Sequence, residues 1–68
     1  MTATFKEANR VRLELKMKIS NYHWYKSSEV MPEDDGYAVI VIVSQVSNAV
    51  RKIINPIIDG VSIKVEHR

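Results

Sequence analysis

Hydrophobic residues after the middle of the chain predict a strand followed by a helix. Residues 37–44 are apolar and β-branched almost throughout, which is typical of a buried strand. Ser44 or Ser47 can then cap a helix that Pro56 ends or kinks. The apolar residues of this predicted helix recur at helical spacing, at Val46, Ala49, Val50, Ile53, Ile54 and Ile57.

Two turns delimit the other predicted strands. Residues 31–36 combine a proline with an Asp-Gly pair, which predicts a hairpin between the strand at 37–44 and an irregular, aromatic-rich strand over 22–30. Asp59 and Gly60 predict a second turn, and apolar and polar residues alternate over 61–66 after it. This last segment is therefore expected to be a strand with one buried face.

The N-terminal segment fits two periods. Strict alternation with polar residues, the period of a strand, holds for Val11, Leu13, Leu15, Met17 and Ile19. A helical stripe is formed equally well by Phe5, Ala8, Val11, Leu15 and Ile19. Good helix formers dominate, and Thr4 with Glu7 fits a capping box, so a helix over residues 4–20 is favoured. In that helix Leu13 and Met17 point away from the main stripe.

The element order is thus α-β-β-α-β within one small domain, residues 1–68. The hairpin gives an antiparallel strand pair, and the strand–helix–strand unit gives a right-handed parallel crossover. The fold class expected is α+β, a two-layer arrangement of a three-stranded mixed sheet with two helices.

Two strand segments resemble a known pattern. Residues 35–43 read D-G-Y-A-V-I-V-I-V, and residues 58–65 read I-D-G-V-S-I-K-V. They are similar to the D-G-x-x-I-V-V-x-V and I-D-G-V-x-V-x-V strands of small α+β modules. Such modules precede some trypsin-like bacterial peptidases and occur in uncharacterised small bacterial and phage proteins. The resemblance covers about half the chain, consists of turn and core residues, and implies no functional residue.

Composition narrows the class of protein. The chain has 68 residues, no cysteine and a net charge of +2, so disulfides and thiolate chemistry are excluded. Residues 1–26 carry six basic and two acidic side chains, whereas residues 27–36 carry four acidic side chains and no basic one. The longest apolar run, 37–43, is far shorter than the ~20 residues that span a bilayer. A cytoplasmic protein without a membrane segment is expected.

The sequence shows no constellation that predicts catalysis, a cofactor or a metal site. His23 and His67 are far apart in sequence, and no serine lies in a G-x-S-x-G elbow. The acidic residues 29–35 lack the alternating spacing of a calcium loop. With two glycines in the chain there is no phosphate-binding loop. We therefore expect a protein that is not an enzyme.

Nucleic-acid binding is one alternative that the residues leave open. Basic side chains on the first helix could neutralise phosphates, and the aromatic residues that follow could stack on bases. The contact residues of this alternative are Lys6, Arg10, Tyr22, Trp24 and Tyr25.

Self-association is the favoured interpretation. Both faces of the strand at 37–44 are apolar, and helices on one side of a two-layer domain cover only one of them. Leu13 and Met17 add a second apolar spot on the first helix. We therefore expect a non-enzymatic protein–protein interaction or accessory domain that forms a homodimer, with an interface among Leu13, Met17, Ile40 and Ile42.

Overall fold

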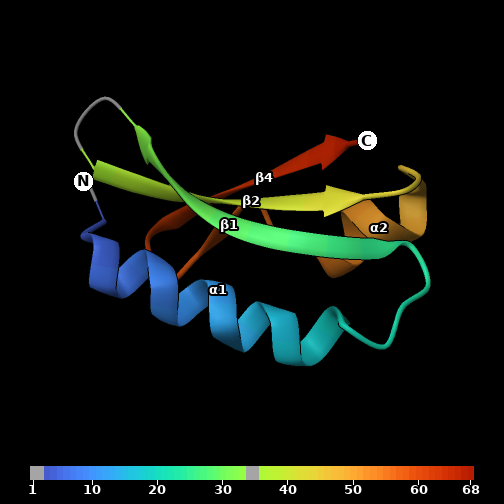
Figure 1. The fold of residues 1–68 in the computed structure, drawn as a ribbon, viewed down its shortest axis with the longest axis horizontal. Helices are drawn as coiled ribbons and strands as arrows, with labels where there is room; N and C mark the ends of the chain where they lie inside the picture. The colour runs from blue at the N-terminus through green and yellow to red at the C-terminus, as the bar shows by residue number, and fades with distance from the viewer. Residues whose placement is uncertain (1–2, 34–35) are drawn as a thin grey trace.

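The structure is a computed structural model that describes residues 3–33 and 36–68. Its elements are α1 (Phe5–Ile19), β1 (Tyr25–Glu33), β2 (Gly36–Val43), α2 (Asn48–Ile53), β3 (Ile57–Ile58) and β4 (Val61–His67). The strands form one sheet in the order β1-β2-β4-β3, and both helices lie on the same side of it (Figure 1). The fold is therefore α+β, with one layer of sheet and one of helices.

The expected three-stranded sheet is wrong, because β3 adds a fourth strand. The helical spacing of apolar residues extended to Ile57, although Pro56 was expected to end or kink the helix near Ile54 or Asn55; α2 ends at Ile53. Pro56, which follows closely, has no N–H to donate to a helical carbonyl. Asp59 and Gly60 then have φ values of 50° and 78°. This left-handed pair is the kind of two-residue turn that joins short antiparallel strands, and it returns the chain so that β3 pairs with the start of β4.

The N-terminal segment forms the helix α1, although its alternating residues also allowed a strand. The capping box is formed: Thr4 Oγ1 accepts from the Glu7 backbone N–H at 3.2 Å, and Glu7 Oε1 accepts from the Thr4 N–H at 3.0 Å. Two N–H groups that the helix start would leave unpaired are thereby satisfied. The side buried against the sheet is the helical stripe Ala8, Val11, Leu15 and Ile19.

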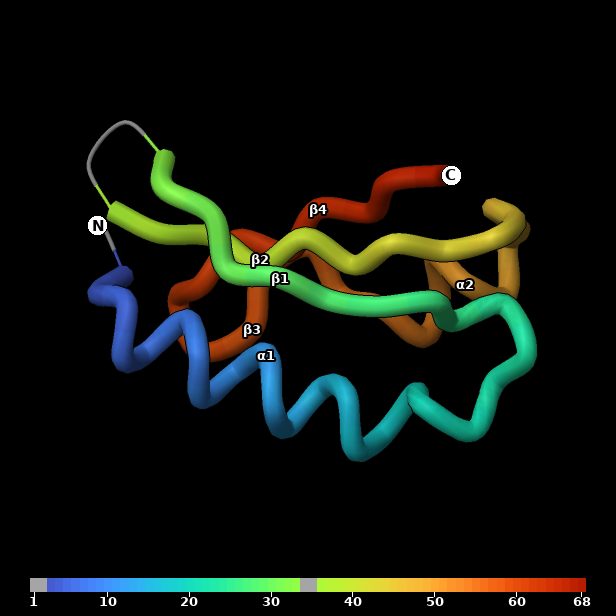
Figure 2. Tube along the Cα trace, in the orientation of Figure 1, coloured from blue at the N-terminus to red at the C-terminus, as the bar shows by residue number. Residues whose placement is uncertain are grey.

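The core lies between the sheet and the two helices. Val39, Val41 and Val43 of β2 are fully buried and face the helical layer. The strand β2 pairs antiparallel with β1 and parallel with β4, so it is central, and the traces of Figure 2 show its neighbours on either side of it. The alternate residues of β2, which include Ile40 and Ile42, face the side of the sheet that neither described helix covers.

The connection between β1 and β2 was predicted to be an Asp-Gly turn. Residues 34 and 35, which contain its aspartates, lie outside the described residues. The ladder of β1 and β2 runs as far as the pair Glu33 and Gly36. Neither helix described is long and apolar enough to cross a membrane.

Candidate functional site

The outer face of α1 carries two exposed apolar side chains, one near the middle of the helix and one in its last turn. Because a helix turns by 100° per residue, the side opposite the buried stripe is occupied by Lys6, Arg10, Leu13 and Met17. Leu13 is 46% exposed and Met17 is 80% exposed. The two interface candidates predicted on this helix therefore lie together, one turn apart, on the surface.

A hollow lies on the same face, between Leu13 and the start of the helix. It has a volume of about 480 Å³ and is lined by Lys6, Glu7, Asn9, Arg10 and Leu13. Four of these positions, 6, 9, 10 and 13, have the spacing i, i+3, i+4 and i+7, which is the spacing of the four residues that surround an inserted side chain in knobs-into-holes helix packing. Arg12 fixes one wall, because its Nε and Nη2 donate to Asn9 Oδ1 at 3.1 and 3.0 Å.

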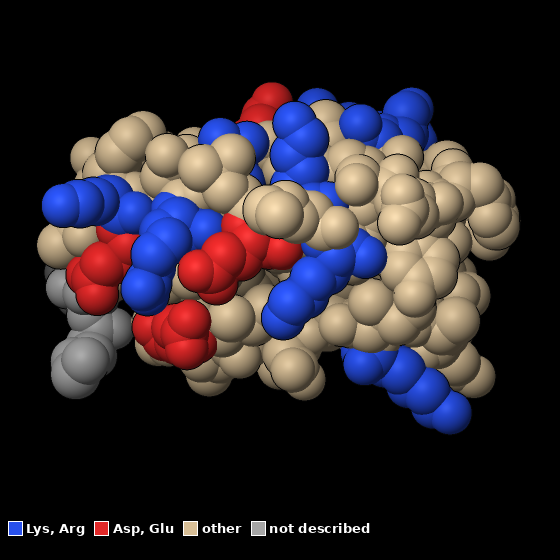
Figure 3. Space-filling view, turned by 90° about the horizontal axis from the view of Figure 1, so that it is seen from below, with Lys and Arg blue, Asp and Glu red and all other residues tan. Residues whose placement is uncertain are grey.

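Charges of both signs border this surface. Seen from below, basic and acidic side chains mix over one half of the helical face, whereas the other half is mostly uncharged (Figure 3). Arg10 Nη2 lies 3.9 Å from Asp59 Oδ2, and both side chains are more than half exposed, so this pair contributes little to stability. The pKa of Glu7 is lowered from its ordinary value by the hydrogen bonds it shares with Thr4, first of all the one from the Thr4 backbone N–H.

One flank of this face shows a regular alternation that the sequence interpretation missed. Glu7, Arg10, Glu14 and Lys18 are spaced by three or four residues and follow one side of α1. Their charges alternate from negative to positive along the helix. The signal was present in the sequence, but it becomes visible only once the helix and its buried side are fixed.

The other two interface candidates lie on the opposite side of the molecule. Ile40 is half-buried and Ile42 is only 5% exposed, although no helix covers them. Ile40 is paired with Glu29 on β1 and with Lys64 on β4, and long neighbouring side chains of this kind cover apolar surface with their stems. Lys64 Nζ also lies 2.6 Å from Glu33 Oε1. A single patch cannot contain all four predicted interface residues.

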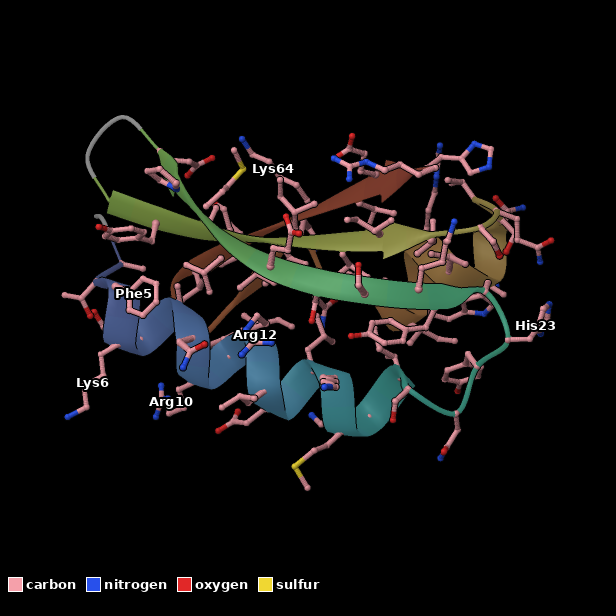
Figure 4. All side chains as sticks on the ribbon, viewed as in Figure 1. Phe5, Lys6, Arg10, Arg12, His23 and Lys64 are labelled. Carbon is pink, nitrogen blue, oxygen red and sulfur yellow. The ribbon has the colours of Figure 1, made fainter. Side chains whose placement is uncertain are left out.

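The nucleic-acid contact residues are likewise divided between two ends of the molecule. Lys6 and Arg10 extend from the first half of α1, away from the sheet, whereas His23 marks the aromatic segment beyond the other end of the helix (Figure 4). Trp24 is 4% exposed, and Tyr22 stacks on it with ring centroids 5.0 Å apart.

Tyr25, the last of the predicted aromatic contacts, is half-buried against the core, and its hydroxyl lies 3.0 Å from Ser28 Oγ. Tyr22 is thus the one residue of the three whose ring is substantially exposed, at 41%.

Potential catalytic groups do not converge in the described part of the chain. His67 Nε2 lies 2.8 Å from the Ser44 carbonyl oxygen, so this nitrogen donates its proton there and is not a base for a serine hydroxyl. Residues 3–33 and 36–68 contain no group of three His, Asp or Glu side chains placed to hold a metal ion. No protein-family model, curated protein or solved structure matches this chain. The resemblance of its strands to small α+β modules stays a prediction.

Proposed function

We propose that this protein is a non-enzymatic, cytoplasmic protein–protein interaction domain that forms a homodimer through the outer face of α1. The observation that carries the proposal is the exposure of Leu13 and Met17, 46% and 80%, on that face. Ile40 and Ile42 are removed from the interface, because neighbouring side chains of the same sheet already cover them to a large extent.

The energetics favour a weak dimer. Complete burial of a leucine or methionine is worth about 1.5–3 kcal/mol, so the exposed fractions of Leu13 and Met17 correspond to about 2–4 kcal/mol per copy. Two copies gain twice this amount, against an association cost of about 4–15 kcal/mol. Apolar burial alone therefore does not give tight binding, and further contacts at the rim of the patch have to contribute.

Several features support a role without catalysis. His67 is engaged with a main-chain carbonyl, and Glu7, whose pKa is lowered, serves the cap of α1. Nucleic-acid binding is the alternative function, but the separation of Lys6 and Arg10 from the aromatic segment gives it no support.

Sedimentation equilibrium tests the proposal from about 1 µM to about 1 mM, the range that corresponds to binding energies of about −8 to −4 kcal/mol. We expect the mass to rise with concentration from 7.8 kDa towards twice that value. Met17→Lys should keep the protein monomeric. At the lowest concentration, where the wild type is also monomeric, the melting temperatures of the two proteins should be equal, because the side chain is 80% exposed. Ile57→Lys is the matched control, since Ile57 is 65% exposed on the edge strand β3, and it should leave the dimer intact.

A wild-type mass of 7.8 kDa at the highest concentration would overturn the proposal. A salt-sensitive complex with DNA or RNA, formed by a protein that remains monomeric, would favour the nucleic-acid alternative instead.

A further inference from the structure

We infer that two copies pair through α1 in antiparallel orientation, with the two-fold axis passing beside Leu13. This inference rests on the proposed self-association and assigns its geometry. Three features of α1, which share Arg10, select this arrangement: the position of the hollow, the order of charges on one flank, and the basic residues near the start of the helix.

The hollow and the protruding methionine are placed symmetrically about Leu13. Met17 follows Leu13 by four residues, and Asn9, in the wall of the hollow, precedes it by four. In an antiparallel pair centred on Leu13, Met17 of each copy therefore faces the hollow of the other. The unbranched and flexible side chain of methionine is well suited to fill an irregular space of this kind.

The flank charges are complementary in the same arrangement. In an antiparallel helix pair each flank meets the same flank of the partner in reverse order. The charges along this flank alternate from negative to positive in the order Glu7, Arg10, Glu14 and Lys18. When the order is reversed in the second copy, each negative side chain lies opposite a positive one. Glu7 faces Lys18 of the second copy and Arg10 faces Glu14, each pair aligned along the axis within about 3 Å at 1.5 Å per residue.

Contacts within one copy leave these groups able to pair. Glu7 holds the helix cap through Oε1, so its Oε2 can accept from Lys18 of a second copy. Arg10 is joined to Asp59 by a long and exposed contact of 3.9 Å, which a better partner can replace. On the other flank Lys16, three residues after Leu13, faces the uncharged Asn9, four residues before it.

A parallel pair would bring like charges together on the outer face of α1. It would place Lys6 against Lys6 and Arg10 against Arg10 of the second copy, and such like-charge contacts are unfavourable. In the antiparallel pair Lys6, seven residues before Leu13, lies opposite Ser20, seven residues after it. The orientation is thus set by charge, while Leu13 and Met17 supply the apolar contact.

Cysteine cross-linking distinguishes the two orientations, because the chain has no cysteine of its own. Leu13→Cys should form a disulfide-linked dimer rapidly under mild oxidation, since its two copies meet at the axis. Lys6→Cys should not, because the two thiols would be about 20 Å apart along the helices at 1.5 Å per residue, far beyond disulfide range. Rapid linkage of Lys6→Cys would indicate a parallel pair and overturn the inference.

A charge exchange provides a second readout that does not depend on oxidation. Arg10→Glu and Glu14→Arg should each weaken the dimer about tenfold, because each change converts two attractive contacts per dimer into repulsive ones. The double variant should return to within about threefold of wild type. Lys52→Glu, on α2, is the control and should have no effect. Single variants without effect, or a double variant as weak as either, would overturn the inference.

The two proposals fail in different ways. A wild-type protein that stays monomeric in sedimentation would remove the self-association itself. A wild-type dimer that persists while Leu13→Cys fails to cross-link would retain self-association and reject the α1 pairing.

Discussion

Substitution of Trp24 tests whether the aromatic segment at residues 22–25 belongs to the core or binds a ligand. Trp24 precedes β1, is 4% exposed and belongs to the core beside the buried stripe of α1. Tyr22 stacks on one face of its ring with an angle of 13° between the planes. The Trp24 carbonyl oxygen accepts from the Ser44 backbone N–H at 2.8 Å, which connects this segment to the end of β2. A nucleobase could stack on Trp24 only after Tyr22 moved away.

The expected cost of removing Trp24 is large for a domain of this size. An aromatic side chain buries about 150–250 Å², which at 25 cal/mol per Å² is worth about 4–6 kcal/mol. Measured Trp→Ala and Phe→Ala changes in cores cost about 3–5 kcal/mol. A stability of about 0.05–0.15 kcal/mol per residue gives about 3–10 kcal/mol for the whole domain. Trp24→Ala should therefore remove between about a third and all of the free energy of unfolding.

Urea unfolding followed by circular dichroism measures this effect directly. Trp24→Ala should be largely unfolded or shifted to a much lower midpoint, whereas Trp24→Phe should retain most of the stability. Tyr22→Ala, the control, should cost about 0.5–1.5 kcal/mol from the lost stack and leave a folded protein. A Trp24→Ala protein within about 1 kcal/mol of wild type would refute the core assignment and return Trp24 to the surface as a candidate base-stacking residue.

Three further predictions concern the turn at Gly60 and the cap of α1. Gly60→Ala should lower the free energy of unfolding by about 1–2 kcal/mol, because Gly60 has a φ of 78°. No atom lies within 4 Å of the added Cβ, so the cost is backbone strain alone. An unchanged urea midpoint would contradict this turn geometry. Thr4→Ala should cost about 1 kcal/mol through the lost cap. The pKa of Glu7 is lowered from 4.5, so its stabilising contribution is present above that value and is lost as the pH falls through its folded pKa. When the free energy of unfolding is measured against pH, Glu7→Gln should reduce the loss of stability at acid pH. An unchanged loss would contradict the role of Glu7 in the helix cap.

The sequence by itself determined the elements whose signals are local. The capping box of Thr4 and Glu7 and the stripe of small and aliphatic residues were sufficient to predict α1, although the alternation over 11–19 also fitted a strand. The β-branched run predicted the central strand β2, and the turn at Asp59 and Gly60 was recognised from its residue types. These signals depend on backbone preferences and side-chain spacing within one segment, which the sequence records directly.

Only the tertiary structure determined which surfaces of those segments are buried and which are exposed. Ile57 and Ile58 carry the same apolar signal in a helix or a strand, and they became a strand because the turn after them brings β4 alongside. Ile42 was predicted to be exposed at an interface, but it is 5% exposed, with Ser27 of β1 and Glu66 of β4 paired on either side of it. Leu13 and Met17 ended on the far side of the molecule from Ile40 and Ile42. Burial depends on which segments become neighbours, and that choice is made by the packing of the whole chain.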